Sequence, residues 1–138
     1  MSNAPPQTPC DRWRTLARVL TAVLFVFAGS KHFTNAPFFR SIVPPSFPNP
    51  ALLVAVSGIC EIAGGLGLLI RPHRTAAGWG LIALLIAVFP ANVYMALHPD
   101  RVVGMHVAQW LLWLRLPLQG IFILWIWSIS RPDAKTRH

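Results

Sequence analysis

Four long apolar runs constrain the fold of this chain more than any other feature of its sequence. They span residues 16–33, 51–70, 76–97 and 107–129, with polar or proline-containing segments between them. The last three have the roughly 20 residues that a helix needs to cross about 30 Å of hydrocarbon. Because the runs are continuous rather than alternating, they favour helices over the strands of a membrane barrel. The sequence therefore predicts an all-α integral membrane protein, a bundle of four transmembrane helices.

The composition agrees with this fold class. Hydrophobic residues make up 54% of the 138 residues and charged residues 12%, whereas a soluble globular chain carries about 25% charged residues. A soluble enzyme and a disordered chain are both disfavoured. We expect a flexible cytoplasmic tail over residues 1–15, a membrane domain over 16–130, and a basic cytoplasmic tail over 131–138.

The basic residues predict how the bundle is oriented. The formal net charge is +8, but these residues lie between the apolar runs rather than in one stripe, so nucleic acid is not an expected partner. Cytoplasmic loops are rich in Lys and Arg, which places both termini in the cytoplasm. Eight basic residues would then be cytoplasmic, namely Arg12, Arg14, Arg18, Arg71, Arg74, Arg131, Lys135 and Arg137. Three would lie outside, namely Lys31, Arg40 and Arg101.

The first run has two interpretations. Arg12, Arg14 and Arg18 precede a short apolar centre, which is followed by the small residues Ala28, Gly29 and Ser30. This order is also typical of a cleavable signal peptide. An uncut first helix is the simpler interpretation, with Lys31 extending toward the interface.

The loop over residues 34–50 is the unusual connection. It contains five prolines and three phenylalanines, and proline excludes a long helix. One helical turn is expected over residues 38–43. The loop is either an ordinary interfacial segment or a lid over a site between the helices.

Two charged residues lie within the apolar runs. Glu61 is in the second run and Arg115 in the fourth, and each costs about 2.5–3.5 kcal/mol near the centre of a membrane helix. Both helices run inward, so a rise of about 1.5 Å per residue puts both side chains roughly 12–16 Å below the outer edge. We expect an inward-facing Glu61–Arg115 ion pair.

Further polar residues share this outer half of the bundle. Ser57 falls on the stripe of Glu61 by helical spacing, Asn92 and Gln119 lie at similar depth, and His32 is a candidate for the rim of a pocket. The pair either locks two helices together, or lines a pocket for a polar head such as a quinone carbonyl, or belongs to a proton path. Exposure of either charge to lipid is the remaining alternative.

The sequence offers little evidence of a metal-binding or redox site. Cys10 and Cys60 have no metal-binding or redox spacing, and Cys60 is expected to be a small buried hydrophobe. A haem held by two of His32, His98 and His106 is disfavoured, because the helical spacing of His106 and Arg115 turns His106 away from the pocket. No zinc or di-iron spacing occurs, so we name no metal ligand and no catalytic residue.

Several phrases resemble the DoxX-like family of small bacterial membrane proteins. They are Phe27-Ala28-Gly29-Ser30-Lys31-His32-Phe33, Ile42-Val43-Pro44-Pro45, Ser57-Gly58-Ile59-Cys60-Glu61-Ile62-Ala63-Gly64-Gly65, Phe89-Pro90-Ala91-Asn92-Val93-Tyr94-Met95 and Arg115-Leu116-Pro117-Leu118-Gln119. The resemblance covers residues 16–130. It implies a four-helix bundle in the bacterial cytoplasmic (inner) membrane. Some members of that family are subunits of quinone-linked oxidoreductases.

Three functions follow as expectations. The first is an accessory, non-catalytic subunit of a membrane redox complex that binds a quinone or similar amphiphile; partners would be the lipid bilayer, other subunits and a second copy of the chain. The second is a small proton-coupled exporter of organic cations, against which Arg115 argues by repelling a cation. The third is a structural or assembly factor with no small-molecule site, which predicts a filled interior beside Glu61.

Overall fold

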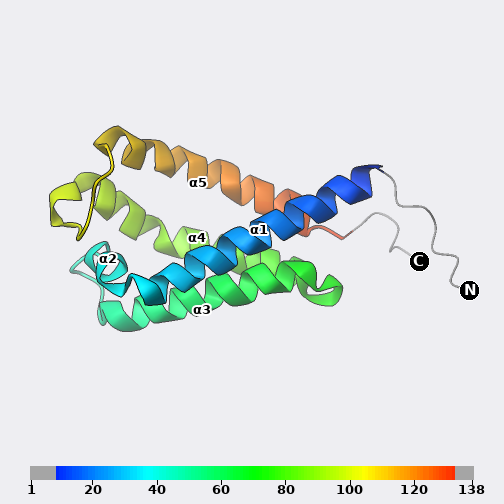
Figure 1. Cartoon of the computed structure of the whole chain (residues 1–138), viewed down its shortest axis with the longest axis horizontal. Coiled ribbons are helices and arrows are strands. Elements are labelled where there is room, and N and C mark those ends of the chain that lie inside the picture. Colours follow the sequence, from blue (N-terminus) through cyan, green and yellow to red (C-terminus); the bar gives the residue numbers. More distant parts are fainter. Residues whose placement is uncertain (1–8, 133–138) are drawn as a thin grey trace, which may run out of the picture.

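The computed structural model describes residues 9–132, and helices account for nearly all of that range (Figure 1). The elements in chain order are α1 (Pro9–Thr34), α2 (Ala36–Ser41), α3 (Pro50–Leu69), η1 (Arg71–His73), α4 (Arg74–Leu97), η2 (Pro99–Arg101) and α5 (Gln109–Ser130). Four helices, α1, α3, α4 and α5, are long and apolar enough to span a membrane. The predicted helical fold with four such helices is confirmed. A short helix does occur in the first loop, but α2 covers Ala36–Ser41 and begins two residues before the expected turn over residues 38–43.

The first helix is longer than expected. It begins at Pro9 rather than at residue 16, so the segment expected to be a flexible tail is helical where the structure describes it. The reason is a contact with the far end of the chain: Arg14 Nη2 donates to the carbonyl of Ser128 at 2.7 Å, and Arg18 Nε to that of Ile129 at 2.7 Å. The predictions for residues 1–8, residues 133–138 and the side chain of Cys10 lie outside the described residues.

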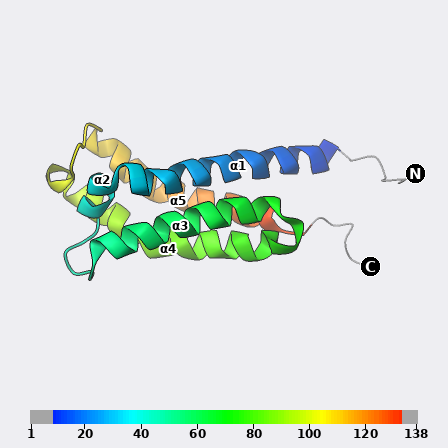
Figure 2. The same ribbon diagram turned by 60° about the horizontal axis from the view of Figure 1, so that its bottom comes forward.

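The helices pack in the order α1, α3, α4, α5, and both ends of the described chain lie at one end of the bundle (Figures 1 and 2). Helices α1 and α5 meet near that end, where Trp13 and Trp125 lie 5.6 Å apart and Phe25 and Phe122 stack at 5.5 Å between ring centroids. Farther along they diverge (Figure 1). The bundle is therefore closed at the end of the termini and open between α1 and α5 toward the α2 end.

Close backbone contact joins α1 to α3. A Cβ atom built on Gly29 would lie 2.6 Å from the carbonyl oxygen of Gly58, and one on Gly58 would lie 2.8 Å from Cβ of His32. Such distances are too short for any side chain, so glycine is required on both helices for this approach.

Two apolar clusters fill the bundle, one toward each end. The cluster near the termini contains Phe25, Leu68, Leu81, Ile82 and Ile126. The cluster at the α2 end contains Ile42, Met95, Ala96, Val102 and Leu112. Along α3, α4 and α5 the buried polar residues Glu61, Asn92 and Gln119 occur between these clusters. A polar layer therefore crosses an otherwise apolar interior.

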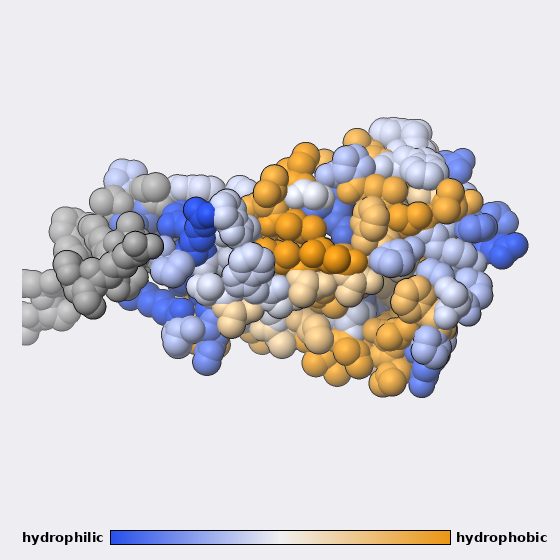
Figure 3. Space-filling view, turned by 180° about the vertical axis from the view of Figure 1, so that it is seen from behind, coloured by the Kyte–Doolittle hydropathy of each residue, from blue (hydrophilic) through white to orange (hydrophobic). Residues whose placement is uncertain are grey.

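The outer surface is an apolar band between two hydrophilic ends (Figure 3). Large exposed apolar side chains occur on all four long helices, among them Leu24, Ile59, Ile86 and Ile121. Cys60 lies on this surface and is exposed, so the expectation that it is a buried hydrophobe is wrong. The reason is its place on α3, because the buried stripe of that helix passes through Gly58 and Glu61.

Candidate functional site

Two adjoining cavities lie at the polar layer of the bundle. The first, the loop-side cavity, has a volume of about 270 Å³ and lies toward α2. The second, the groove cavity, has a volume of about 660 Å³ and lies between α1 and α5. Four residues line both: Glu61, Val88, Asn92 and Arg115. The two cavities therefore meet at the charged and amide groups of the layer.

All six side chains singled out in the sequence lie on these walls. Glu61, Asn92 and Arg115 line both cavities, His32 and Ser57 line the loop-side cavity, and Gln119 lines the groove cavity. They come from α1, α3, α4 and α5. Residues far apart in the sequence thus converge on one region, as their expected depth predicts.

The contact of Glu61 differs from the expected one. Its Oε2 lies 3.5 Å from Nε2 of His32, and Glu61 is 9% exposed. No ion pair joins Glu61 to Arg115 among the described residues. The expectation of a direct Glu61–Arg115 pair is therefore wrong: equal depth in a helix bundle does not set the distance across it, and a cavity lies between the two side chains.

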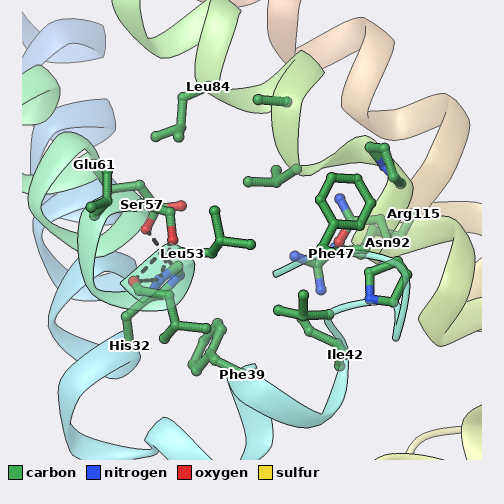
Figure 4. A pocket seen from close by; sticks show the side chains of 18 residues that line it. His32, Phe39, Ile42, Phe47, Leu53, Ser57, Glu61, Leu84, Asn92 and Arg115 are labelled. Atoms are coloured by element: carbon green, nitrogen blue, oxygen red, sulfur yellow. Dashed lines mark hydrogen bonds and ion pairs between the residues drawn. The ribbon is translucent and has the colours of Figure 1, made fainter. Parts of the chain in front are cut away.

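Arg115 faces this cavity from the opposite side (Figure 4). It lies six residues into α5, which begins at Gln109 rather than at residue 107. Its side chain is exposed, and it makes no ion pair or hydrogen bond with another described residue. A guanidinium group has five N–H donors and no acceptor. The cavity is therefore lined by a cation whose donors have no acceptor among the described residues.

His32 is held in one orientation by α3. Its Nδ1 lies 3.0 Å from the carbonyl oxygen of Val54 and 2.9 Å from Oγ of Ser57. The Ser57 hydroxyl in turn donates to the same carbonyl at 3.0 Å. The ring of Phe39 covers that of His32 at 4.1 Å between centroids. His32 is therefore part of the cavity wall (Figure 4). Its sequence context predicts a position at the rim of the pocket instead.

Asn92 and Gln119 form an amide clamp between α4 and α5. Asn92 Nδ2 donates to Oε1 of Gln119 at 2.7 Å, and Gln119 Nε2 donates to the carbonyl of Leu85. Both side chains are buried. The clamp satisfies these amide donors within the protein, in contrast to those of Arg115.

The proline-rich loop covers the loop-side cavity. Phe39 and Ile42 of the α2 region, followed by Val43, Pro44 and Phe47, line its wall. Ser41 Oγ accepts a hydrogen bond of 3.0 Å from the backbone N–H of Val103, which ties the loop to the connection between α4 and α5. The loop therefore forms part of the wall of this cavity, and the two interpretations of it stay predictions.

Sequence reasoning missed the structural role of Arg18. It was expected only as one of the charges that orient the chain, yet it is 3% exposed and donates to the carbonyls of Ile129 and Arg131. Last-turn carbonyls have no partner within their own helix, and a cation there is favoured. The spacing of Arg14 and Arg18, one helical turn apart, is the signal that could have indicated it.

The other candidate ligands do not join the cavities. His98 ends α4 and its Nδ1 lies 3.3 Å from the carbonyl of Tyr94. His106 precedes α5 and is not on it, so the helical angle used to orient His106 does not apply. Within residues 9–132, no three His, Cys, Asp or Glu side chains form a group that could bind a metal.

Fold and site together define a class: a protein with four helices of membrane-spanning dimensions and two largely apolar cavities that meet at charged and amide side chains. Residues 20–130 match a family described as a domain of unknown function, DUF8561, and the chain belongs to this family. No curated protein and no solved structure matches the chain significantly.

Proposed function

We propose that this chain is a DoxX-like membrane protein that binds an amphiphile with an oxygen-bearing head group, of which a quinone is the best example. It spans the bacterial inner membrane four times with both termini in the cytoplasm, and acts as an accessory subunit of a membrane redox complex. The excess of basic residues at the end of the termini supports this orientation.

The observation that carries the proposal is the guanidinium of Arg115, which lines both cavities and makes no ion pair or hydrogen bond with another of residues 9–132. A charged side chain at this depth of a membrane-spanning bundle is strongly unfavourable unless it is paired or hydrogen-bonded. Here the nearest anionic side chain, Glu61, contacts His32 on the other side of the cavity. A ligand carbonyl or anionic oxygen beside Arg115 supplies the missing acceptors.

The groove cavity supports an apolar tail on that ligand. Its walls include Leu24, Phe25 and Ala28 of α1, and Leu118 and Ile121 of α5. Since α1 and α5 diverge toward the α2 end, an acyl or isoprenoid chain can extend between them to the lipid while the head remains at Arg115.

The same geometry weighs against the alternatives. An assembly factor without a ligand predicts a filled interior beside Glu61, whereas two cavities adjoin it. An exporter of organic cations needs a cavity that attracts cations, whereas Arg115 lines both.

The proposal is tested by the thermal stability of the detergent-solubilised protein with a short-chain ubiquinone. At a concentration a hundredfold above its Kd, a ligand stabilises the folded state by about 2.7 kcal/mol. We expect this stabilisation in the wild type and in the matched control Arg101→Gln, whose side chain is exposed on η2, but not in Arg115→Gln. Equal stabilisation of both variants, or none of the wild type, contradicts the proposal.

A further inference from the structure

We propose that His32 and Glu61 hold one proton between them and donate it to the head-group oxygen of the ligand bound in the loop-side cavity. The inference rests on the proposed function, because it needs a ligand there. It adds proton transfer to binding, and it gives Ser57 the role of a positioning residue.

The first step concerns the proton on Nδ1 of His32. A backbone carbonyl oxygen can only accept, and that of Val54 lies 3.0 Å from Nδ1. We therefore infer that Nδ1 carries the hydrogen. The Ser57 hydroxyl donates to the same carbonyl and lies 2.9 Å from Nδ1, so the hydroxyl oxygen accepts from the same N–H. The tautomer of His32 is thus set by α3, as the partner of one ring nitrogen sets the state of the other.

The second step concerns Nε2. With Nδ1 protonated, a neutral ring has a lone pair on Nε2. That lone pair faces Oε2 of Glu61 at 3.5 Å, and Oε2 is buried without a hydrogen-bond partner. A lone pair facing a carboxylate oxygen is repulsive. A proton on either atom makes the contact attractive, either as imidazolium and carboxylate or as imidazole and carboxylic acid.

The third step is access from the cavity. His32, Ser57 and Glu61 all line the loop-side cavity, and Figure 4 shows them together on one wall. Arg115 from α5 is the other charged side chain of the lining; α2 and the loop after it contribute apolar residues, and α4 contributes apolar residues and the amide of Asn92. A head group that spans the cavity with one oxygen beside Arg115 therefore has its other oxygen beside the proton donor, within the hydrogen-bond reach that the transfer needs.

The transfer is a simple acid–base step. The N–H bond of His32 or the O–H bond of Glu61 breaks, an O–H bond forms on an anionic oxygen of the ligand head group, such as an enolate, and no electrons move. The pair then consists of neutral His32 and the carboxylate of Glu61, whose repulsion favours uptake of a new proton from water.

Nitrogen-15 NMR of histidine-labelled protein without ligand tests the proton arrangement by itself. We expect Nδ1 of His32 to be protonated in the wild type, with the resonance assigned by its loss in His32→Gln. In Ser57→Ala the Val54 carbonyl remains as acceptor, so Nδ1 stays protonated but is less well ordered. An unprotonated Nδ1 in the wild type overturns the inference.

A hydroxynaphthoquinone tests the transfer, because its anion and its neutral acid absorb differently. At a pH where the free probe is the anion, we expect the bound probe to have the spectrum of the neutral acid in the wild type and in the matched carboxylate control Asp100→Asn. In Glu61→Gln we expect the spectrum of the anion.

The outcomes separate the two proposals. A wild-type protein that binds the probe as the anion overturns the proton transfer and leaves the proposed function intact. A wild type that does not bind the probe contradicts both. Should Glu61→Gln fail to fold, the wild-type spectrum decides alone.

Discussion

At the scale of single residues, the cavity is characterised by which polar groups have partners among the described residues and which have none. Asn92 and Gln119 satisfy each other and the carbonyl of Leu85. His32 satisfies Nδ1 with α3 and directs Nε2 at Glu61. Arg115 is the group that these contacts leave out, so it determines what chemistry the ligand must bring.

The amide clamp is expected to contribute to stability rather than to binding. Replacement of Gln119 by leucine leaves the Asn92 amide buried without its acceptor, and we expect a loss of about 1–2 kcal/mol in the free energy of unfolding. The matched control is Gln109→Leu, since Gln109 is exposed and makes only a 3.4 Å contact with the carbonyl of Ala96. Reversible unfolding in detergent measures both; equal stabilities contradict the structural role of the clamp.

Sequence reasoning identified the residues of the site better than the contacts among them. The type and depth of Glu61, Asn92, Arg115 and Gln119 follow from their place in apolar helices. The contacts among these residues depend on the distances between helices. The periodicity of a single helix gives no information about those distances. The partner of Glu61 is His32 because Gly29 and Gly58 bring α1 against α3, a consequence of two glycines on different helices.

At the scale of elements, the position of His32 depends on the close packing of α1 on α3. In Gly58→Ala the new Cβ would lie 2.8 Å from Cβ of His32, so the helices must separate. We expect a loss of about 1–3 kcal/mol in the free energy of unfolding from this overpacking. Gly120→Ala is the control, because no atom lies within 4 Å of a Cβ there and alanine favours helix. The free energy of unfolding of both variants tests this prediction. A Gly58→Ala variant that is as stable as the wild type refutes the packing argument.

The contact between the beginning of α1 and the end of α5 gives a second prediction at this scale. Replacement of Arg18 by glutamine removes the 2.7 Å hydrogen bond to the carbonyl of Ile129, and we expect about 1–2 kcal/mol of destabilisation, since hydrogen bonds from charged groups are worth roughly 1.5–3 kcal/mol. Hydrogen exchange should become faster in the last turn of α5. Arg12→Gln, at an exposed position of α1, should leave that exchange unchanged.

The extent of the helices follows largely from the sequence. The four apolar runs predict α1, α3, α4 and α5. The length and continuous hydrophobicity of a run can be recognised without knowing its contacts with the rest of the molecule. The start of α1 at Pro9 is different, since it depends on carbonyls more than a hundred residues away in the chain. A local pattern cannot contain such a contact.

At the scale of the whole molecule, the uneven packing of four helices explains the cavities. Helices α1 and α5 meet near the termini and diverge toward α2, which leaves the groove cavity between them. The loop-side cavity and this lateral opening would give the proposed amphiphile a few polar groups for its head and an apolar outlet for its tail.

Orientation in the membrane is tested by labelling intact cells with a membrane-impermeant thiol reagent, after Cys10 and Cys60 are replaced by alanine. We expect Asp100→Cys, between α4 and α5, to be labelled directly. We expect His73→Cys, at the other end of the bundle, to be labelled only after permeabilisation. The reverse pattern contradicts cytoplasmic termini.

The central claim is that Arg115 binds the head of an amphiphile inside the bundle, and its most direct test is the lipid content of the protein purified from native membranes in mild detergent. Extraction and mass spectrometry should find one quinone or related amphiphile retained by the wild type and by Arg101→Gln, and lost from Arg115→Gln. A wild type that retains no such molecule, or an Arg115→Gln variant that retains as much, contradicts the account.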